Sequence, residues 1–450
     1  MRIHFIAIGG SAMHNLAIAL HKKGFVVSGS DDVIAEPSKG RLAQYNLLPI
    51  HMGWDESNIS PGLDAVILGM HAFEDNPELL KAKELGLRIY SYPEYIYEQS
   101  KDKLRVVIGG SHGKTTITSM ILHVMNYYKR DFDYLVGAQL EGFDTMVKLT
   151  AEAPVIIIEG DEYLASTIDR RPKFHLYKAN IGVISGIAWD HVNVFPTFDN
   201  YILQFDIFIN TIQPDGKLIY CQSDPVLTAL VDKSTAPVEK IPYSIPPHDL
   251  RDGITYLLPE ETPLHIFGDH NLMNLNAAKL VCATLGISGK DFNRAISTFK
   301  GASKRLELML SEAQTNVYKD FAHSPSKVKA TIEAVKSQFK GRKLVACMEL
   351  HTFSSLNKNF LLQYQGTMDK ADEAIVYINE NTFKQKKTTP FSSFEVESAF
   401  KNSKLHFFND ALELKAYLLG LDFKNTNLLL MSSGNFGGVD FVKLARELSK

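Results

Sequence analysis

Short runs of apolar residues recur along the chain, and most are followed by a glycine-rich or polar turn and then by a helical pattern. The clearest runs are RIHFIAI at 2–8, LRVVI at 104–108, PVIII at 154–158 and IGVISGI at 181–187. Apolar runs of this length without strict alternation are typical of strands buried on both faces of a parallel sheet. The pattern therefore predicts an α/β protein with mostly parallel sheets.

The same pattern, together with the length of the chain, predicts three domains. Domains usually hold about 100 to 200 residues, and a chain of 450 residues is too long for one ordinary core. We predict a Rossmann-like domain at residues 1–103, a central phosphate-loop ATPase-like domain at 104–302 and a C-terminal Rossmann-like α/β domain at 303–450.

The central domain opens with a strand that turns through glycines directly into a helical pattern, at GGSHGKTT in 109–116. Such a turn points backbone N–H groups at one spot, where the positive end of the helix favours anions. The glycine spacing is shorter than in the common G-x-x-x-x-G-K-[ST] loop, but the chemistry is the same. We expect Lys114 to reach the β- and γ-phosphates and Thr115 to hold Mg²⁺. The predicted nucleotide contacts are Gly110, Ser111, His112, Gly113, Lys114, Thr115 and Thr116.

Two other strands of this domain end in residues suited to a metal ion. The run at 154–158 leads into Glu159, and the run at 181–187 leads towards His191. Ligands of open α/β sheets lie at the carboxyl ends of the strands, so both residues are expected near Lys114. We predict Thr115, Glu159 and His191 as magnesium ligands. A hydrogen-bonded loop histidine is the structural alternative, since Mg²⁺ usually prefers oxygen donors.

The first hundred residues contain a second, weaker nucleotide signal. The strand at 2–8 is followed by Gly9, Gly10 and Ser11, and the next strand ends at Asp31. In a Rossmann-like βαβ unit the glycine turn admits a pyrophosphate and the acidic residue accepts a ribose hydroxyl. Ala7 stands where the fingerprint has its first glycine, so a plain structural turn is an equal alternative on this evidence alone.

Composition and charge exclude several classes of protein. A formal charge of −3, 45% hydrophobic and 22% charged residues are typical of a globular protein without a general affinity for nucleic acid or membranes. The three cysteines, Cys221, Cys282 and Cys347, are far apart and predict neither a disulfide framework nor a zinc site. No apolar run approaches membrane-spanning length, and we expect a cytoplasmic protein that binds neither nucleic acid nor membrane.

The order of the motifs resembles the Mur ligases, ATP-dependent amide-forming enzymes of peptidoglycan synthesis. The resemblance extends over essentially the whole chain. It rests on SHGKTT at 111–116, EGDE at 159–162, WDH at 189–191, GDHNLMNLNAA at 268–278, KRLE at 304–307 and DFAHSPS at 320–326. It implies ATP and Mg²⁺ as cofactors. It also implies a stepwise reaction in which a carboxylate attacks ATP to form an acyl phosphate and an amine then displaces phosphate.

The resemblance assigns nucleotide contacts beyond the phosphate loop. Asn271 would face adenine, Asp320 would meet the ribose, and Arg305 would neutralise phosphate charge. By themselves, Asn271 is as well explained by helix capping and Arg305 by a solvated position. The residues predicted to act in catalysis are Lys114, Glu159, His191 and Arg305. Closure of the third domain would complete this site and exclude water from the acyl phosphate.

Within the family, the N-terminal IGG and SGSD resemble the branch whose carboxylate substrate is UDP-N-acetylmuramate. Many other members carry a carbamylated lysine after the DH motif, and residues 199–210 contain no lysine, which favours this branch. The resemblance and the glycine turn together predict a substrate site. Its expected residues are Gly9, Gly10, Ser11, Asp31, His71, Glu162, His323 and His351.

The amine substrate is the least determined part. DRRPKF at 169–174 and MSSGNFGG at 431–438 resemble members that add the recycled tripeptide L-alanyl-γ-D-glutamyl-meso-diaminopimelate. The segment ELHTFS at 349–354 lacks the arginine of enterobacterial members of that group, and its His351 resembles members that add L-alanine. We predict the tripeptide, with L-alanine as the alternative, and a monomer or weak homodimer.

Two other functions compete with this hypothesis. A nucleotide-binding regulator could keep the fold without catalysis, but intact Lys114, Thr115, Glu159 and His191 argue against it. A folate polyglutamylating ligase of related fold fits poorly with a glycine-rich domain ahead of the phosphate loop.

Overall fold

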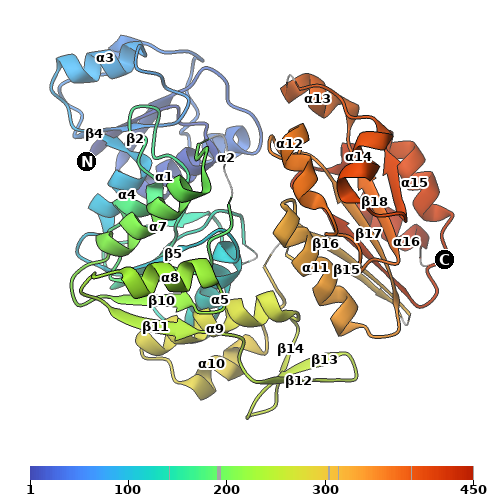
Figure 1. Ribbon diagram of the computed structural model, residues 1–450. Coiled ribbons are helices and arrows are strands. Elements are labelled where there is room, and N and C mark those ends of the chain that lie inside the picture. Colours follow the sequence, from blue (N-terminus) through green and yellow to red (C-terminus); the bar gives the residue numbers. More distant parts are fainter. Residues whose placement is uncertain (141, 190–193, 303–304, 313, 387, 449–450) are drawn as a thin grey trace. The chain divides into compact units, whose positions relative to one another are not determined.

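The computed structural model describes residues 1–140, 142–189, 194–302, 305–312, 314–386 and 388–448 (Figure 1). The chain forms two compact units. Unit 1 comprises Met1–Ser244 and Leu275–Phe292, and unit 2 comprises Ile245–Asn274 and Asn293–Lys450. The division falls inside two helices, α9 (Asp269–Thr284) and α10 (Gly289–Ile296). The three predicted domain ranges stay a prediction.

Unit 1 begins with a four-stranded parallel sheet in the order β2-β1-β3-β4. Its strands are β1 (Arg2–Ile6), β2 (Val26–Ser30), β3 (Ala65–Leu68) and β4 (Ile89–Ser91). The connecting helices are α1 (Ser11–Lys22), α2 (Ser38–Gln44), η1 (Glu56–Asn58), α3 (Pro77–Glu84) and α4 (Tyr92–Ser100). Helix α3 shows how the sequence sets these boundaries, because Asn76 caps it by accepting a hydrogen bond from Leu79 N and Pro77 occupies its first turn.

The second sheet of unit 1 has seven strands in the order β11-β10-β9-β5-β8-β6-β7, and β7 alone pairs in antiparallel fashion. Its strands are β5 (Leu104–Gly109), β6 (Asp133–Leu135), β7 (Val147–Lys148), β8 (Val155–Glu159), β9 (Ile181–Ile184), β10 (Lys217–Cys221) and β11 (Glu239–Tyr243). Its helices include α5 (Lys114–Tyr127), α6 (Lys173–Leu176), α7 (Phe198–Thr211) and α8 (Pro225–Lys233). Because β5 lies between β8 and β9, the carboxyl ends of these three strands are neighbours.

Unit 2 contains a three-stranded antiparallel sheet and a six-stranded sheet in the order β15-β16-β20-β17-β18-β19. Only β15 is antiparallel in the larger sheet. The strands are β12 (His248–Arg251), β13 (Ile254–Leu257), β14 (Thr262–Leu264), β15 (Glu307–Glu312), β16 (Thr315–Asp320), β17 (Lys343–Glu349), β18 (Glu373–Tyr377), β19 (Leu405–Phe408) and β20 (Thr426–Met431). The helices are α11 (Pro325–Gln338), α12 (Lys358–Leu361), η2 (Leu362–Tyr364), α13 (Glu380–Lys386), α14 (Ser393–Phe400), α15 (Ala411–Leu419), η3 (Phe436–Gly438) and α16 (Phe441–Leu448).

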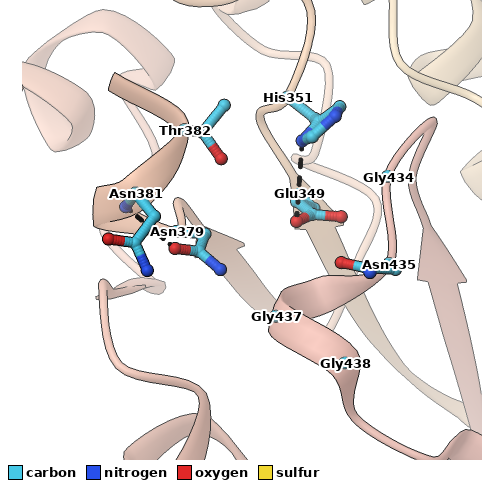
Figure 2. Close-up of a pocket in the computed structure, with 9 residues that line it drawn as sticks. All are labelled: Glu349, His351, Asn379, Asn381, Thr382, Gly434, Asn435, Gly437 and Gly438. Atoms are coloured by element: carbon cyan, nitrogen blue, oxygen red, sulfur yellow. Dashed lines mark hydrogen bonds and ion pairs between the residues drawn. The ribbon is translucent and has the colours of Figure 1, made fainter. Parts of the chain in front are cut away.

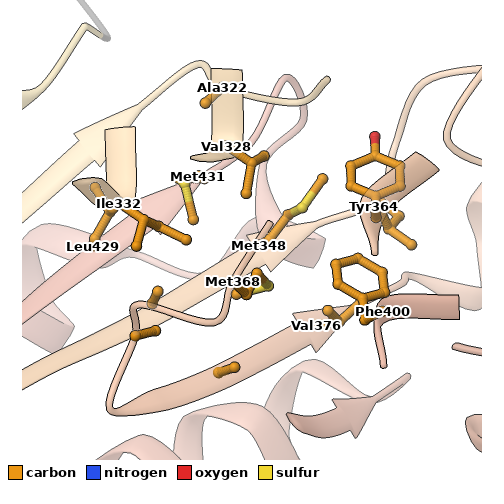
Figure 3. Close-up of a cluster of buried hydrophobic side chains, with 14 of the residues drawn as sticks. Ala322, Val328, Ile332, Met348, Tyr364, Met368, Val376, Phe400, Leu429 and Met431 are labelled. Carbon is orange, nitrogen blue, oxygen red and sulfur yellow. The ribbon is translucent and has the colours of Figure 1, made fainter. Parts of the chain in front are cut away.

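The larger sheet of unit 2 buries apolar side chains on both faces. Ala346 and Met348 of β17 belong to one core cluster, whereas Val345 and Cys347, which alternate with them, belong to another. Figure 3 shows the first cluster, in which Met348 faces helix α11. A strand with no solvent-facing side is the physical reason why the apolar runs in the sequence lack strict alternation.

The predicted α/β class with mostly parallel sheets is confirmed by this topology. All three cysteines are buried and free of disulfide bonds. Among the residues that the structure describes, no helix is long and apolar enough to cross a membrane.

Candidate active site

The predicted phosphate loop lies between strand β5 and helix α5, and two of its glycines have backbone angles that side chains disfavour. Gly110 has a φ of +122° and Gly113 a φ of +78°. A Cβ atom on Gly110 would lie 2.2 Å from Ser185 Oγ, so the loop packs closely against the segment after β9. Helix α5 begins at Lys114, and its N-terminus therefore follows the loop directly.

Lys114 is partly buried and already paired with a carboxylate. Its Nζ donates to Glu162 Oε2 at 2.7 Å, to Glu162 Oε1 at 3.0 Å and to the Gly110 carbonyl oxygen at 2.6 Å. The Glu162 side chain is 1% exposed. Burial works against the charged lysine, but the carboxylates of Glu162, Asp161 and Glu159 outweigh it and raise the pKa of Lys114. The lysine is therefore charged at neutral pH.

Thr115 and Glu159 place side by side two oxygen atoms that can bind a metal ion. Thr115 Oγ1 donates to Glu159 Oε1 at 2.7 Å, and Gly137 N donates to Glu159 Oε2 at 2.7 Å. A hydroxyl and a carboxylate fit Mg²⁺, which takes few protein ligands and completes its shell with phosphate and water. Among the described residues there is no cluster of three or more histidine, cysteine or acidic side chains that could hold a metal by itself. His191 lies outside the described residues.

A tyrosine that no sequence motif contains completes the network around the loop. Tyr201 of α7 is fully buried, and its hydroxyl lies 2.9 Å from Ser111 Oγ and donates to Glu162 Oε1 at 3.3 Å. Ser111 Oγ also accepts from Ala188 N at 2.8 Å. Ser185 Oγ donates to the His112 carbonyl oxygen. Tyr201 is 90 residues from Ser111, so local spacing offered no signal for it.

The N-terminal glycine turn is closed by the acidic residue predicted beside it. Gly9 N donates to Asp31 Oδ2 at 2.7 Å, and Asp31 is fully buried. Burial raises the pKa of Asp31, although the hydrogen bond from Gly9 acts in the opposite direction. Ala7, which replaces the first glycine of the fingerprint, has a φ of +69°. The turn thus keeps the left-handed backbone that a glycine would adopt more easily.

Four other predicted residues of unit 1 lie at the start of α1, in a connection and inside α5. Gly10 precedes the first residue of α1, Ser11, which is exposed. His71 is exposed in the connection between β3 and α3. Thr116 is buried within α5.

The residues predicted to contact the nucleoside lie in unit 2. Asn271 is buried, and its Nδ2 donates to the Phe267 carbonyl oxygen at 3.0 Å. Asp320 accepts hydrogen bonds from Leu306 N and Ala322 N, each at 2.7 Å. Both side chains therefore have local structural partners. Their contacts with a nucleotide stay predictions.

Arg305 and His323 both lie close to Phe321, the residue that follows strand β16. The guanidinium of Arg305 is 4.6 Å from the centre of the Phe321 ring. His323 Nδ1 lies 2.8 Å from the carbonyl oxygen of the same Phe321. Leu306, the residue after Arg305, donates its N–H to Asp320, so the segment before β15 is held against the end of β16.

A pocket of about 440 Å³ lies at the carboxyl ends of β17, β18 and β20 in unit 2 (Figure 2). Glu349 is 1% exposed, and its Oε2 accepts hydrogen bonds from Phe436 N at 2.9 Å and from Ser432 Oγ. Its Oε1 lies 4.0 Å from His351 Nδ1. Asn435 and Asn379 add amide groups to the lining. The pocket therefore combines a held carboxylate with neutral hydrogen-bonding groups.

Burial also shapes the histidine of this pocket. It lowers the pKa of His351, more than the nearby Glu349 carboxylate raises it. Gly434 is needed beside the pair, because a Cβ atom there would lie 2.7 Å from Glu349 Oε2 and 2.8 Å from His351 Cγ. The sequence pointed to His351 but not to Glu349, although Glu349 is the last residue of β17 and His351 follows two positions later.

Mostly parallel sheets with a glycine loop between a strand and a helix are typical of proteins that bind nucleoside phosphates, and comparison with known proteins identifies the family. Residues 2–103 match the description "Mur ligase family, catalytic domain", and residues 108–282 match "Mur ligase middle domain". The chain therefore belongs to the Mur ligase family, whose members use ATP and build peptidoglycan precursors. The family resemblance and the ligase class predicted from the sequence are confirmed.

The similar proteins include one relative by sequence and two solved structures that share the fold. A UDP-N-acetylmuramate–L-alanine ligase of Clostridium acetobutylicum is 31% identical over 433 residues, covering 91% of this chain and 90% of that protein. The fold is similar to a murein peptide ligase from Psychrobacter arcticus, with a TM-score of 0.64, 22% identity and coverage of 100% and 99%. It is also similar to the UDP-N-acetylmuramate-alanine ligase from Thermotoga maritima, with a TM-score of 0.69, 19% identity and coverage of 100% and 98%.

Proposed function

We propose that this protein joins the carboxylate of UDP-N-acetylmuramate to the amine of L-alanine at the expense of ATP. The observation that carries the ATP-dependent step is the grouping of Lys114, Thr115 and Glu159 at the ends of β5 and β8. The amine is taken from the curated relatives, since an L-alanine ligase matches 91% of the chain at 31% identity.

The chain's own groups would serve ATP as follows. The N–H groups of the phosphate loop would cradle the phosphates, and Lys114 would leave Glu162 for the β- and γ-oxygens. Thr115 and Glu159 would hold Mg²⁺, with His191 as a further proposed ligand. When bound, the cation would neutralise charge on the transferring phosphoryl group. Arg305 of unit 2 is proposed to add a second positive charge.

The proposed chemistry has two steps. A carboxylate oxygen of the substrate attacks the γ-phosphorus, the bond to the bridging oxygen breaks, and ADP leaves an acyl phosphate behind. The deprotonated amine then attacks the acyl carbon, and inorganic phosphate departs with the electron pair of the C–O bond. Positioning and charge neutralisation dominate such a transfer, and a partly buried lysine beside a glycine loop supplies both.

The other substrates would occupy two further places. The glycine turn at Gly9 and Gly10 is proposed to admit the pyrophosphate of the UDP moiety, at the N-terminus of α1. The pocket around Glu349 and His351 is proposed to bind the amine substrate, because a carboxylate held by two hydrogen bonds is suited to an ammonium group.

The recycled tripeptide is the second candidate amine, and the pocket in unit 2 favours it. A cavity of about 440 Å³ is large for the single methyl side chain of L-alanine. The size of the pocket supports the tripeptide independently of the curated relatives.

A single assay tests both candidates. The purified chain is supplied with ATP, Mg²⁺ and UDP-N-acetylmuramate, and ADP release is measured with L-alanine or with the tripeptide. Release that requires both UDP-N-acetylmuramate and L-alanine supports the proposal. Faster turnover with the tripeptide selects the second candidate. No amine-dependent release with either compound would refute the ligase function proposed here.

A further inference from the structure

A hydrogen-bond network in unit 1 joins helix α1 to the loop before β7, well away from the phosphate loop in sequence. Its centre is the fully buried side chain of Asn15. Asn15 Nδ2 donates to the Ser11 carbonyl oxygen at 2.8 Å. Its Oδ1 accepts from Met146 N at 3.0 Å and from Arg41 Nη1 at 3.2 Å. One amide thus connects the start of α1, helix α2 and the loop.

Arg41 holds the same loop at two other points. Its Nη2 donates to Gln139 Oε1 at 2.6 Å and to the Asp144 carbonyl oxygen at 3.1 Å. We call residues 136–140 and 142–146 the Gly137 loop. Side chains of α1 and α2 therefore hold this loop at Gln139, Asp144 and Met146.

The other side of the Gly137 loop reaches the carboxylate proposed to bind magnesium. Val136 N donates to the Met146 carbonyl oxygen at 2.9 Å, so the residue bonded to Asn15 also fixes Val136. The next residue, Gly137, donates its N–H to Glu159 Oε2 at 2.7 Å. A Cβ atom on Gly137 would lie only 2.8 Å from Glu159 Oε1, so the loop approaches the carboxylate as closely as a backbone can.

The position of this loop matters for the orientation of the Glu159 carboxylate. The residue is 9% exposed, and the Gly137 N–H and Thr115 hydroxyl are its hydrogen-bond donors. The orientation of a buried carboxylate depends on the hydrogen-bond donors that it meets. Groups that orient a metal ligand without touching the metal typically change its affinity by about 10- to 100-fold when they are removed.

We propose that Asn15 and Arg41 are positioning residues for the magnesium–nucleotide site. They hold the Gly137 loop where its N–H orients Glu159 for the cation. Residues of α1 and α2 would thus control how much magnesium increases the affinity for the nucleotide. The inference rests on the proposed function only in taking Glu159 as a ligand of the cation that accompanies the nucleotide.

Calorimetric titration of ADP, once with Mg²⁺ and once with EDTA, tests this directly. The magnesium gain is the ratio of the two dissociation constants. In Asn15→Leu and Arg41→Ala we expect the gain to fall by about tenfold, while ADP binding in EDTA stays within about twofold of wild type because the phosphate loop is untouched.

Lys22→Ala is the matched control, because Lys22 also contacts the Gly137 loop, through Asp144 Oδ2 at 3.9 Å. Its side chain is 40% exposed and that of Asp144 90%, so this pair contributes little. The control should keep the full magnesium gain. Arg41→Lys should recover part of the gain lost in Arg41→Ala.

The outcomes separate the inference from the proposed function. If wild type shows a magnesium gain and the variants keep it, or lose ADP binding equally in both buffers, the inference is wrong and the ligase function stands. If wild type binds no ADP in either buffer, the proposed function and the inference both fail. If circular dichroism shows that Asn15→Leu does not fold, the Arg41→Ala variant tests the inference, because Arg41 is only half-buried.

Discussion

The phosphate loop of unit 1 and the pocket of unit 2 hold opposite charges by opposite means. In the loop, the cation of Lys114 is paired with a buried carboxylate, so its charge is compensated until an anion displaces Glu162. In the pocket, Glu349 is held by a backbone N–H and a hydroxyl, which leaves its negative charge uncompensated by a cation within the described lining. The first arrangement suits a polyanion and the second an ammonium group.

The largest effect that would follow from this comparison is at Lys114. Lys114→Ala removes the positive charge at the loop, and we expect kcat for ADP release to fall by about 10²- to 10³-fold, as when a transition-state donor is lost. Lys217→Ala is the control, because Lys217 makes an ion pair with Glu239 away from the loop. A Lys114→Ala protein that retains more than a tenth of wild-type kcat would contradict the assignment.

A substitution in the pocket of unit 2 should change KM for the amine substrate alone. Glu349→Gln removes the negative charge while keeping the shape, and we expect KM for the amine to rise about 10- to 100-fold, the range for a charged hydrogen bond. KM for ATP should stay unchanged in the same steady-state assay. Equal increases in both KM values would show that Glu349 maintains the fold of unit 2 and does not bind the amine.

Replacing Glu162 breaks its ion pair with Lys114 and tests the comparison from the carboxylate side. In Glu162→Gln, Lys114 loses a partner with which ADP would have to compete, so we expect metal-free ADP to bind about tenfold more tightly as the desolvation cost of the unpaired lysine is relieved. The free protein should melt at a lower temperature, and ADP should restore part of the difference. Weaker ADP binding would mean that Glu162 helps to hold the nucleotide.

The smallest expected effect is a difference in pH dependence between the two regions. Lys114, whose pKa is raised, stays charged from pH 8 to 6, so KM for ATP should be flat. Burial holds the pKa of His351 below 6.5, so the ring is neutral at pH 7 and gains a proton only as the pH falls below that range. A cation beside Glu349 then opposes the ammonium group, and KM for the amine should rise a few-fold.

His351→Gln is the variant that identifies the source of this pH dependence. Without a titrating ring, the rise in KM at low pH should shrink to the part that comes from the substrate amine itself. An unchanged profile in this variant would assign the whole effect to the substrate.

Much of the ATP-binding region followed from short-range pattern. An apolar run, a glycine turn and a helical pattern place Lys114 and Thr115 at the start of α5, because backbone preferences act over a few residues. The expected proximity of Glu159 also follows, since β5 and β8 are parallel neighbours with Ile108 in register with Glu159. The nucleotide and metal roles of these residues remain predictions.

The partners of these residues were not predictable in the same way. Glu162 was expected to contact substrate, yet it is bonded to Lys114, 48 positions away in sequence. Tyr201 and Arg41 were not selected at all, because neither stands in a motif. Which side chain meets a given donor depends on how separate elements pack, and no local periodicity encodes that choice.

The sequence by itself determined the fold class, the family and the sites where strands end in chemically useful residues. Hydrophobic periodicity and glycine positions are properties of short stretches of sequence, so they can be recognised without knowing the fold. Only the tertiary structure decided that Glu162 pairs with Lys114, that a backbone N–H and a hydroxyl hold Glu349, and that Asn15 reaches the Gly137 loop. These contacts depend on packing between elements far apart in the chain, where burial makes each hydrogen-bond partner matter.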